Sequence, residues 1–217
     1  MLWTATPRRV AIAAAGAGLV AGLAAPPLAA SARAVLGVHL VTVSALPDDA
    51  RAVMMAEVQR LWARAGVTVE WLATGAAADD RALRVLVVSR HKPTPAGTHR
   101  WPVAELLIDA LPLPTAIASL EGAWRVVDVA APASGELAVL RHQRLGRVLG
   151  RAVAHEIGHH LLGRVHTPRG LMRTRIDAMN LADLRDGGFA VERRGAMVAV
   201  AALTRPPLRL AALPTPR

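Results

Sequence analysis

Residues 145–162 constrain the fold of this chain more than any other stretch, because their pattern leaves little choice of secondary structure. Apolar residues recur in them three or four positions apart, which is the spacing of one face of an α-helix. Gly163 follows directly, and glycine tolerates the positive φ that commonly ends a helix. The stretch therefore predicts a helix with one buried face, followed by a turn at Gly163.

Three residues of this helix form the motif H-E-x-x-H: His155, Glu156 and His159. Residues four apart share a helix face, so both imidazoles can bind one Zn²⁺ from the same side. Glu156 follows the first histidine, where it can accept a proton from water that the metal activates. His166 comes after the predicted turn and can return to the metal as third ligand, which leaves a fourth position open. The motif thus predicts a catalytic zinc site.

The pattern as a whole, with Gly163, His166 and Met172 after the motif, resembles the metzincin clan of zinc metallopeptidases. The resemblance covers about twenty residues closely. It implies that the three histidines bind zinc, that Glu156 is the general base, and that Met172 is the Met-turn residue below the metal. Members of the clan have the glycine and the third histidine three and six residues after the second ligand. Here they follow His159 by four and seven residues, so we expect one extra residue in the turn.

Peptide hydrolysis also needs a hydrogen-bond donor for the oxyanion that forms on the substrate. The chain has no tyrosine, which excludes the phenol as that donor. Arg173, directly after the predicted Met-turn, is one candidate, and His160 and His142 on the predicted helix are others. His160 lies about 100° round the helix from His159, so it cannot pair with His155 as a ligand.

Two alternatives to this assignment differ in the ligand set. In a gluzincin-like site the third ligand is a downstream carboxylate, for which Asp177, Asp183, Asp186 and Glu192 are candidates. In a non-catalytic exported zinc-binding or envelope interaction protein, the site is structural. A structural site uses four protein ligands and has no open position.

Residues 1–32 have the pattern of a secretory signal peptide. Arg8 and Arg9 precede an apolar run rich in Gly and Ala, and small residues follow up to cleavage sites after Ala32 or Ala34. The apolar run is short for a membrane span, so we expect no stable membrane anchor after cleavage; a retained N-terminal anchor is the alternative. The predicted location is the periplasm or the outside of the cell. The arginine pair leaves the twin-arginine export route open.

Charge and cysteine content limit the partners and ligands. The formal net charge is +10, but the basic residues are scattered and only 3% of the chain is aromatic, so we expect no nucleic-acid partner. The expected partner is a peptide or protein substrate. The absence of cysteine excludes disulfides and thiolate zinc sites, which leaves histidine and carboxylate side chains as strong zinc ligands.

Residues 33–205 are predicted to form a single α+β domain of the zincin kind, with a mixed twisted sheet, the active-site helix and a C-terminal helix. Strand patterns occupy 35–43, 67–72, 83–88 and 124–129. Helices are predicted from an N-cap at Asp48 or Asp49 to Gly66, and over 191–203. The metzincin resemblance implies that the strand at 124–129 is the sheet edge along which an extended peptide lies. Residues 180–184 have the composition of a turn, and the proline-rich residues 206–217 that of a disordered tail.

Overall fold

The computed structural model of the protein describes residues 34–73, 76, 81–90, 103–107, 113–132, 135–185 and 188–205. The predicted signal peptide and the predicted proline-rich tail lie outside these ranges, as does Asp186. Among the described residues, no helix combines the length and the apolar character needed to cross a membrane.

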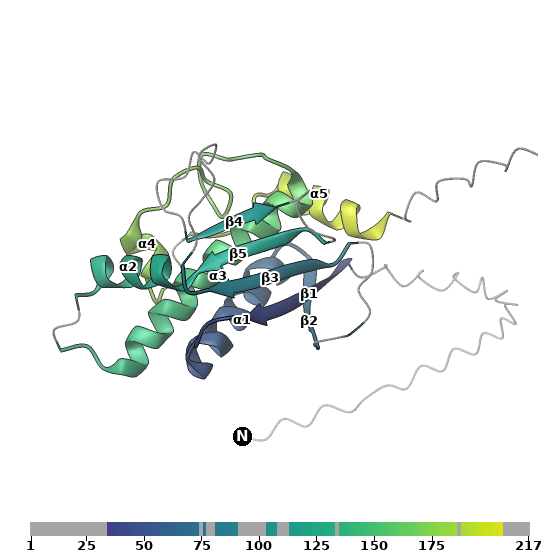
Figure 1. Ribbon diagram of the computed structural model, residues 1–217. Helices are drawn as coiled ribbons and strands as arrows, with labels where there is room; N and C mark the ends of the chain where they lie inside the picture. Colours follow the sequence, from purple (N-terminus) through teal and green to yellow (C-terminus); the bar gives the residue numbers. More distant parts are fainter. Residues whose placement is uncertain are drawn as a thin grey trace, which may run out of the picture. The chain divides into compact units, whose positions relative to one another are not determined.

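A five-stranded mixed sheet forms one layer of the fold (Figure 1). Its strands lie in the order β2-β1-β3-β5-β4, and all neighbours run parallel except β4, which is antiparallel to β5. The strands are β1 (Ala34–Thr42), β2 (Val67–Leu72), β3 (Leu83–Val88), β4 (Ala104–Leu107) and β5 (Thr115–Ser119). The α+β organisation predicted from the sequence is confirmed, and β1, β2 and β3 are the strands predicted at 35–43, 67–72 and 83–88.

Helices α1 and α3 cover one face of this sheet, and Figure 1 shows both behind it. The helices are α1 (Asp48–Ala63), α2 (Leu120–Ala130), α3 (Ala138–Leu162), α4 (Ala178–Ala182) and α5 (Arg193–Thr204). In β1 the buried residues Ala34, Leu36 and Val38 alternate with half-buried ones. A period of two is expected of a sheet that packs helices on one face, because successive strand residues point to opposite faces.

Helices α1 and α3 approach closely because small residues recur every four positions along α3. A Cβ atom added at Gly146 or Gly150 would lie 2.6 Å or 2.9 Å from a carbonyl oxygen of α1, closer than real Cβ atoms come. Ala154 continues this stripe, and its carbonyl accepts a hydrogen bond of 3.2 Å from the indole of Trp62 on α1. The predicted helix at 145–162 is confirmed as part of α3, and the stripe fixes its position against α1.

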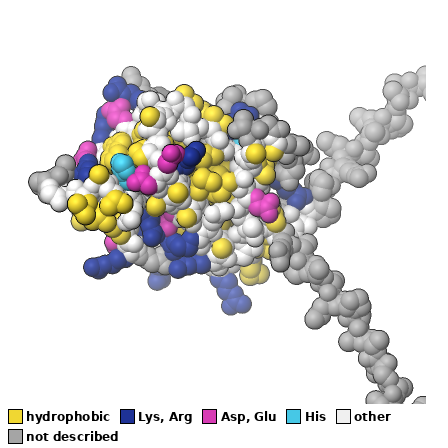
Figure 2. Space-filling model, turned by 90° about the horizontal axis from the view of Figure 1, so that it is seen from below, with side chains coloured by type: hydrophobic (Ala, Val, Ile, Leu, Met, Phe, Trp, Pro, Cys, Tyr) yellow, Lys and Arg dark blue, Asp and Glu magenta, His cyan; other side chains and the backbone are white. Residues whose placement is uncertain are grey.

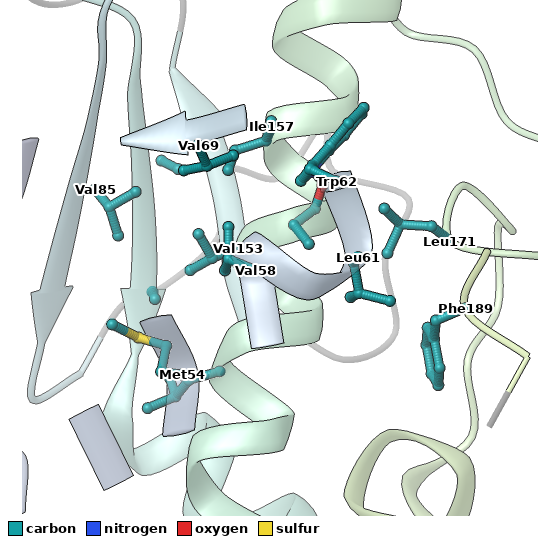
Figure 3. Packing of buried hydrophobic residues seen from close by; sticks show 14 of the residues in the cluster. Met54, Val58, Leu61, Trp62, Val69, Val85, Val153, Ile157, Leu171 and Phe189 are labelled. Carbon is teal, nitrogen blue, oxygen red and sulfur yellow. Dashed lines mark hydrogen bonds between the residues drawn. The ribbon is translucent and has the colours of Figure 1, made fainter. Parts of the chain in front are cut away.

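The core also includes the loops that follow α3. Figure 3 shows side chains of α1 and α3 between Val85 of β3 on one side and Leu171 and Phe189 on the other. Leu171 and Phe189 are at most 1% exposed and belong to the same hydrophobic cluster as the sheet residues. The segment after α3 is therefore packed into the fold, and its backbone is held in place near that helix.

The prediction of a strand at 124–129 is wrong, because these residues lie in α2. Ser119 is the N-cap of this helix, and its side chain accepts a hydrogen bond of 3.0 Å from the backbone N–H three residues later. Ala123, Val126 and Val127 are buried, a helical spacing. The valines suit a strand by composition, but the cap and the spacing of the buried positions favour the helix. The sheet edge on this side is β4 instead.

Smaller differences concern the ends of the other helices. Pro47 is the N-cap of α1, while Asp48 and Asp49 lie in its first turn, where carboxylates interact favourably with the helix dipole. The segment predicted as a turn at 180–184 begins inside the short helix α4, which Asp177 caps. The closing helix predicted over 191–203 is α5.

Candidate metal centre

Three histidine side chains meet at the C-terminal end of α3. His155 and His159 lie one helical turn apart, and His166 reaches them from the following loop. Their candidate ligand atoms lie within 4.8 Å of one another, and no other group of three or more metal-binding side chains occurs among the described residues. Two nitrogens on one tetrahedral Zn²⁺ lie about 3.3 Å apart, given Zn–N bonds of about 2.0–2.1 Å. Small side-chain rotations are therefore enough to bring this set onto one cation.

The turn after α3 explains how His166 reaches the other two histidines. Gly163 is the C-cap, with a φ of 76° in the left-handed region that favours glycine. Its N–H donates to the carbonyl of His159 at 3.0 Å, and the N–H of Val165 donates to the carbonyl of Gly163 at 2.8 Å. The second bond closes a tight three-residue turn. The turn lies between His159 and His166, where the sequence has one residue more than the metzincin pattern.

Backbone carbonyls orient two of the three imidazoles. Nδ1 of His155 donates to the carbonyl of Leu171 at 2.8 Å, and Nδ1 of His159 donates to that of Gly163 at 3.2 Å. A carbonyl can only accept, so in each neutral ring Nδ1 carries the proton and Nε2 presents a lone pair. This is the form of imidazole that binds a metal ion, and the bond to the carbonyl fixes the ring orientation.

Glu156 directly follows His155 on α3 and is buried, with 7% of the residue exposed. Burial raises the pKa of its carboxyl group to about 8; the backbone N–H of Leu106 lowers that pKa by hydrogen bonding, and the charge of Glu105 raises it. Both of these residues belong to β4, so the edge strand lies at the carboxyl group. A carboxyl group whose pKa is near the working pH is suited to general acid–base catalysis.

Met172 packs against α3 at Gly158, which lies between the two helical histidines in sequence. Met172 is 3% exposed, and a Cβ atom added at Gly158 would lie only 2.1 Å from its sulfur. The N–H of Thr167 donates to the carbonyl of Met172 at 2.9 Å and ties the two ends of the loop together. The glycine inside the H-E-x-x-H motif therefore makes room for the methionine beneath the helix that carries His155 and His159.

Two of the candidate oxyanion donors lie outside the histidine group. His142 precedes His155 by thirteen residues of α3, which is about 20 Å along the helix axis. This separation excludes His142 as a donor at the site. Its Nδ1 instead lies 2.9 Å from a carboxylate oxygen of Asp49. His160 has its Nε2 at 3.1 Å from the carbonyl oxygen of Arg81, and burial lowers its pKa.

Arg173 remains as an oxyanion candidate. It directly follows Met172, and its guanidinium carbon lies 4.8 Å from the centre of the Phe189 ring. Within the described part of the chain, its Nε and Nη2 atoms are buried and have no hydrogen-bond partner. Buried donors without a partner are rare in folded proteins, and they can pair with an acceptor that reaches them.

None of the downstream carboxylates among the described residues joins the histidine group. Asp177 accepts a hydrogen bond of 2.8 Å from a backbone N–H of α4, and Asp183 accepts one of 2.9 Å from the backbone two residues later. Glu192 is exposed at the N-cap of α5. Asp186 is not among the described residues. Within the described ranges, then, His166 is the side chain that joins the two helical histidines.

Two groups at the site could not be predicted from the sequence, and both belong to the main chain. They are the carbonyl of Leu171, which orients His155, and the N–H of Leu106, which donates to Glu156. Main-chain groups leave no side-chain signal in a sequence. The pattern around β4 is also weak, because the strand has four residues and prolines follow it at 112 and 114.

The charged surface of the protein is mixed in sign. Figure 2 shows a face on which basic and acidic side chains are interspersed with hydrophobic ones, with basic side chains gathered along its lower rim. Ion pairs join Arg51 to Asp48 at 2.7 Å and Arg141 to Asp128 at 2.6 Å. Exposed pairs of this kind contribute little to stability.

No protein-family model matches this chain, and no curated protein or solved structure matches it significantly. The metzincin resemblance thus rests on the motif H-E-x-x-H with Gly163, His166 and Met172. To these residues the structure adds the mutual placement of their side chains.

Proposed function

We propose that this protein is a zinc hydrolase whose metal is held by His155, His159 and His166. The observation that carries the proposal is the convergence of three imidazoles, two of them oriented by backbone carbonyls, beside the buried Glu156. Three protein ligands leave the fourth position open, which is typical of catalytic rather than structural zinc sites. When bound, Zn²⁺ would polarise a substrate carbonyl and lower the pKa of water.

Within this class, we propose a metzincin-like metallopeptidase of the zincin fold. Support comes from the packing of Met172 below the histidines and from the position of β4. An edge strand has backbone groups that are not paired within the sheet, and an extended peptide can pair with them. β4 takes the substrate-binding place that the sequence pattern gave to residues 124–129. The predicted signal peptide supports action in the periplasm or outside the cell.

The chain's own residues supply the proton transfers. The charge of a bound cation would lower the pKa of Glu156, and in the proposed reaction the ionised carboxylate accepts a proton from the attacking water and then passes it to the leaving amine. The N–H of Leu106 keeps the carboxyl group oriented through the hydrogen bond from β4. Arg173 is the proposed donor to the oxyanion of the substrate.

The test combines metal content with cleavage of a general peptide library by the purified mature protein. We expect zinc in the wild-type protein and in Glu156→Ala, and a loss of turnover of about 10²–10⁴-fold in that variant, because only the general base is removed. His155→Ala should lose the metal. His142→Ala, a histidine substitution on the same helix far from the site, should keep both zinc and activity.

Two results would count against the proposal. Full turnover by Glu156→Ala would remove the general base from the mechanism. A wild-type protein that binds zinc through four protein ligands and cleaves nothing would be a structural zinc protein, which is the non-catalytic alternative.

A further inference from the structure

We propose that Arg151 is a positioning residue for the metal centre: it fixes the loop segment whose backbone orients His155. The inference rests on the proposed zinc site and goes beyond it, because Arg151 does not belong to the ligand set. Arg151 lies one helical turn before His155 on α3 and is 0% exposed. A fully buried guanidinium is rare unless its donors are used, so its partners indicate its role.

Most of the donors of Arg151 go to main-chain carbonyls in the C-terminal part of the chain. Nη1 donates to the carbonyls of Asn180 at 2.7 Å and Leu181 at 2.9 Å, and Nη2 donates to that of Arg185 at 2.7 Å. Nε donates to Glu57 of α1 at 3.0 Å. One side chain therefore joins α3 to α1, to the last turn of α4 and to the segment after α4.

Arg151 also contacts the ring of Phe189, at 4.5 Å from its guanidinium carbon to the ring centre. Phe189 is 1% exposed, and the guanidinium of Arg173 lies 4.8 Å from the same ring centre. The cation–π contact with Arg151 thus fixes the residue that precedes Ala190. Phe189 is also in contact with the loop that carries the Met-turn residue, through Arg173.

From Ala190, which follows Phe189, one backbone hydrogen bond and one side-chain hydrogen bond lead to His155. The N–H of Leu171 donates to the carbonyl of Ala190 at 3.0 Å, and the carbonyl of Leu171 accepts from Nδ1 of His155 at 2.8 Å. The fit is tight, since a Cβ atom added at Gly170 would lie 2.4 Å from the carbonyl oxygen of Ala190. A shift of the segment around Phe189 would therefore move the carbonyl that orients the His155 ring.

Lysine cannot replace arginine in this role. Arg151 makes four hydrogen bonds in different directions and stacks on a ring, whereas a lysine ammonium is a compact charge on a flexible stem. Arg147, one turn earlier on α3, offers a matched control. It donates to Glu57 at 2.6 Å, as Arg151 does, but none of the hydrogen bonds of the described residues joins it to the loop carbonyls.

The experiment measures zinc affinity by competition with a chelator, together with the unfolding of the metal-free protein. Both Arg151→Lys and Arg147→Lys should lower the stability of the metal-free protein, because both disturb the pairing of Glu57. At a temperature where circular dichroism shows each variant to be folded, Arg151→Lys should bind zinc roughly tenfold more weakly. Arg147→Lys should bind zinc with wild-type affinity.

Equal zinc affinities in the two variants would overturn the inference, because a purely structural role lowers stability alone. If Arg151→Lys does not fold, Phe189→Leu decides: it keeps an apolar side chain and removes the ring. Wild-type zinc affinity in Phe189→Leu would then overturn the inference. Failure of the wild-type protein to bind zinc is a different outcome, and it would reject the proposed function instead.

Discussion

Two buried glutamates show how differently the same side chain behaves in two regions of this protein. Glu57 on α1 is 2% exposed and Glu156 on α3 is 7% exposed. Burial raises the pKa of Glu57, but the hydrogen bond from Arg60 and the charges of Arg147 and Arg151 outweigh it and hold that pKa below its usual range. For Glu156, burial prevails and raises the pKa to about 8.

Two things differ: the Glu156 carboxyl group lies deeper than that of Glu57, and the neighbours of the two groups carry different charges. Three arginines donate to Glu57 at 2.6–3.0 Å, whereas the groups that act most on Glu156 after burial are a backbone N–H and the negative charge of Glu105. A buried carboxylate surrounded by cations stays ionised and holds helices together. A buried carboxyl group without them can exchange its proton near neutral pH, which is the property that catalysis needs.

Substitution by glutamine should separate the two roles most strongly. Glu57→Gln removes the charge that three guanidinium groups share, and breaking such a buried ion pair costs about 3–5 kcal/mol of folding stability. Burial of the Glu156 carboxyl group lowers the stability of the metal-free protein, because burial disfavours its ionised form. Glu156→Gln removes this group, so the variant should be at least as stable as the wild type. Urea unfolding of the metal-free proteins measures both effects. Similar losses of stability in the two variants would show that the two glutamates do not have different roles.

The two glutamates should also give opposite pH dependences of stability in the metal-free protein. Glu57 has a folded pKa below its reference value of 4.5, so its contribution is present above that pH and is lost as the pH falls through the folded pKa. Glu156 has a folded pKa of about 8, so the folded state keeps a proton that the unfolded state releases above its reference value of 4.5. Glu156 therefore makes the stability of the metal-free protein decline as the pH rises from 4.5 to about 8.

Urea unfolding between about pH 3 and about pH 9, in the presence of a chelator, tests these signs. The free energy by which the wild type is more stable than Glu57→Gln should shrink on acidification. The advantage of Glu156→Gln over the wild type should grow between pH 4.5 and about 8, the values for the unfolded and folded carboxyl group. A difference between wild type and Glu156→Gln that does not vary with pH would show that Glu156 titrates normally.

The sequence predicted those parts of the fold and of the candidate site that depend on local pattern. The apolar spacing at 145–162 and the glycine after it were enough to place that part of α3 and its end, but not its first turns from Ala138. The alternation in 67–72 was enough to place β2. His155, Glu156 and His159 could be named for the same reason, because their relation depends only on helix geometry.

The rest depends on contacts between residues that are far apart in the chain. Arg151 contacts residues about thirty positions later, and Glu57 accepts hydrogen bonds from residues about ninety positions away. No local pattern signals such partners. The strand predicted at 124–129 failed for a related reason, since valines favour strands in isolation but the N-cap at Ser119 and burial on one side select a helix. β4 is recognisable only through its pairing with β5.

Trp62→Phe should give the smallest effect and sets a scale for the loss of an uncharged polar group at the same α1–α3 interface. The indole is 0% exposed and donates to the carbonyl of Ala154 at 3.2 Å. In the helix the Ala154 carbonyl also accepts from the N–H four residues later, so it keeps a hydrogen-bond partner when the indole is removed. We expect Trp62→Phe to lower the free energy of unfolding by about 1–2 kcal/mol, because it loses one neutral hydrogen bond and leaves a small cavity. Urea unfolding measures this loss. A loss as large as that of Glu57→Gln would mean that packing, rather than charge, dominates this interface.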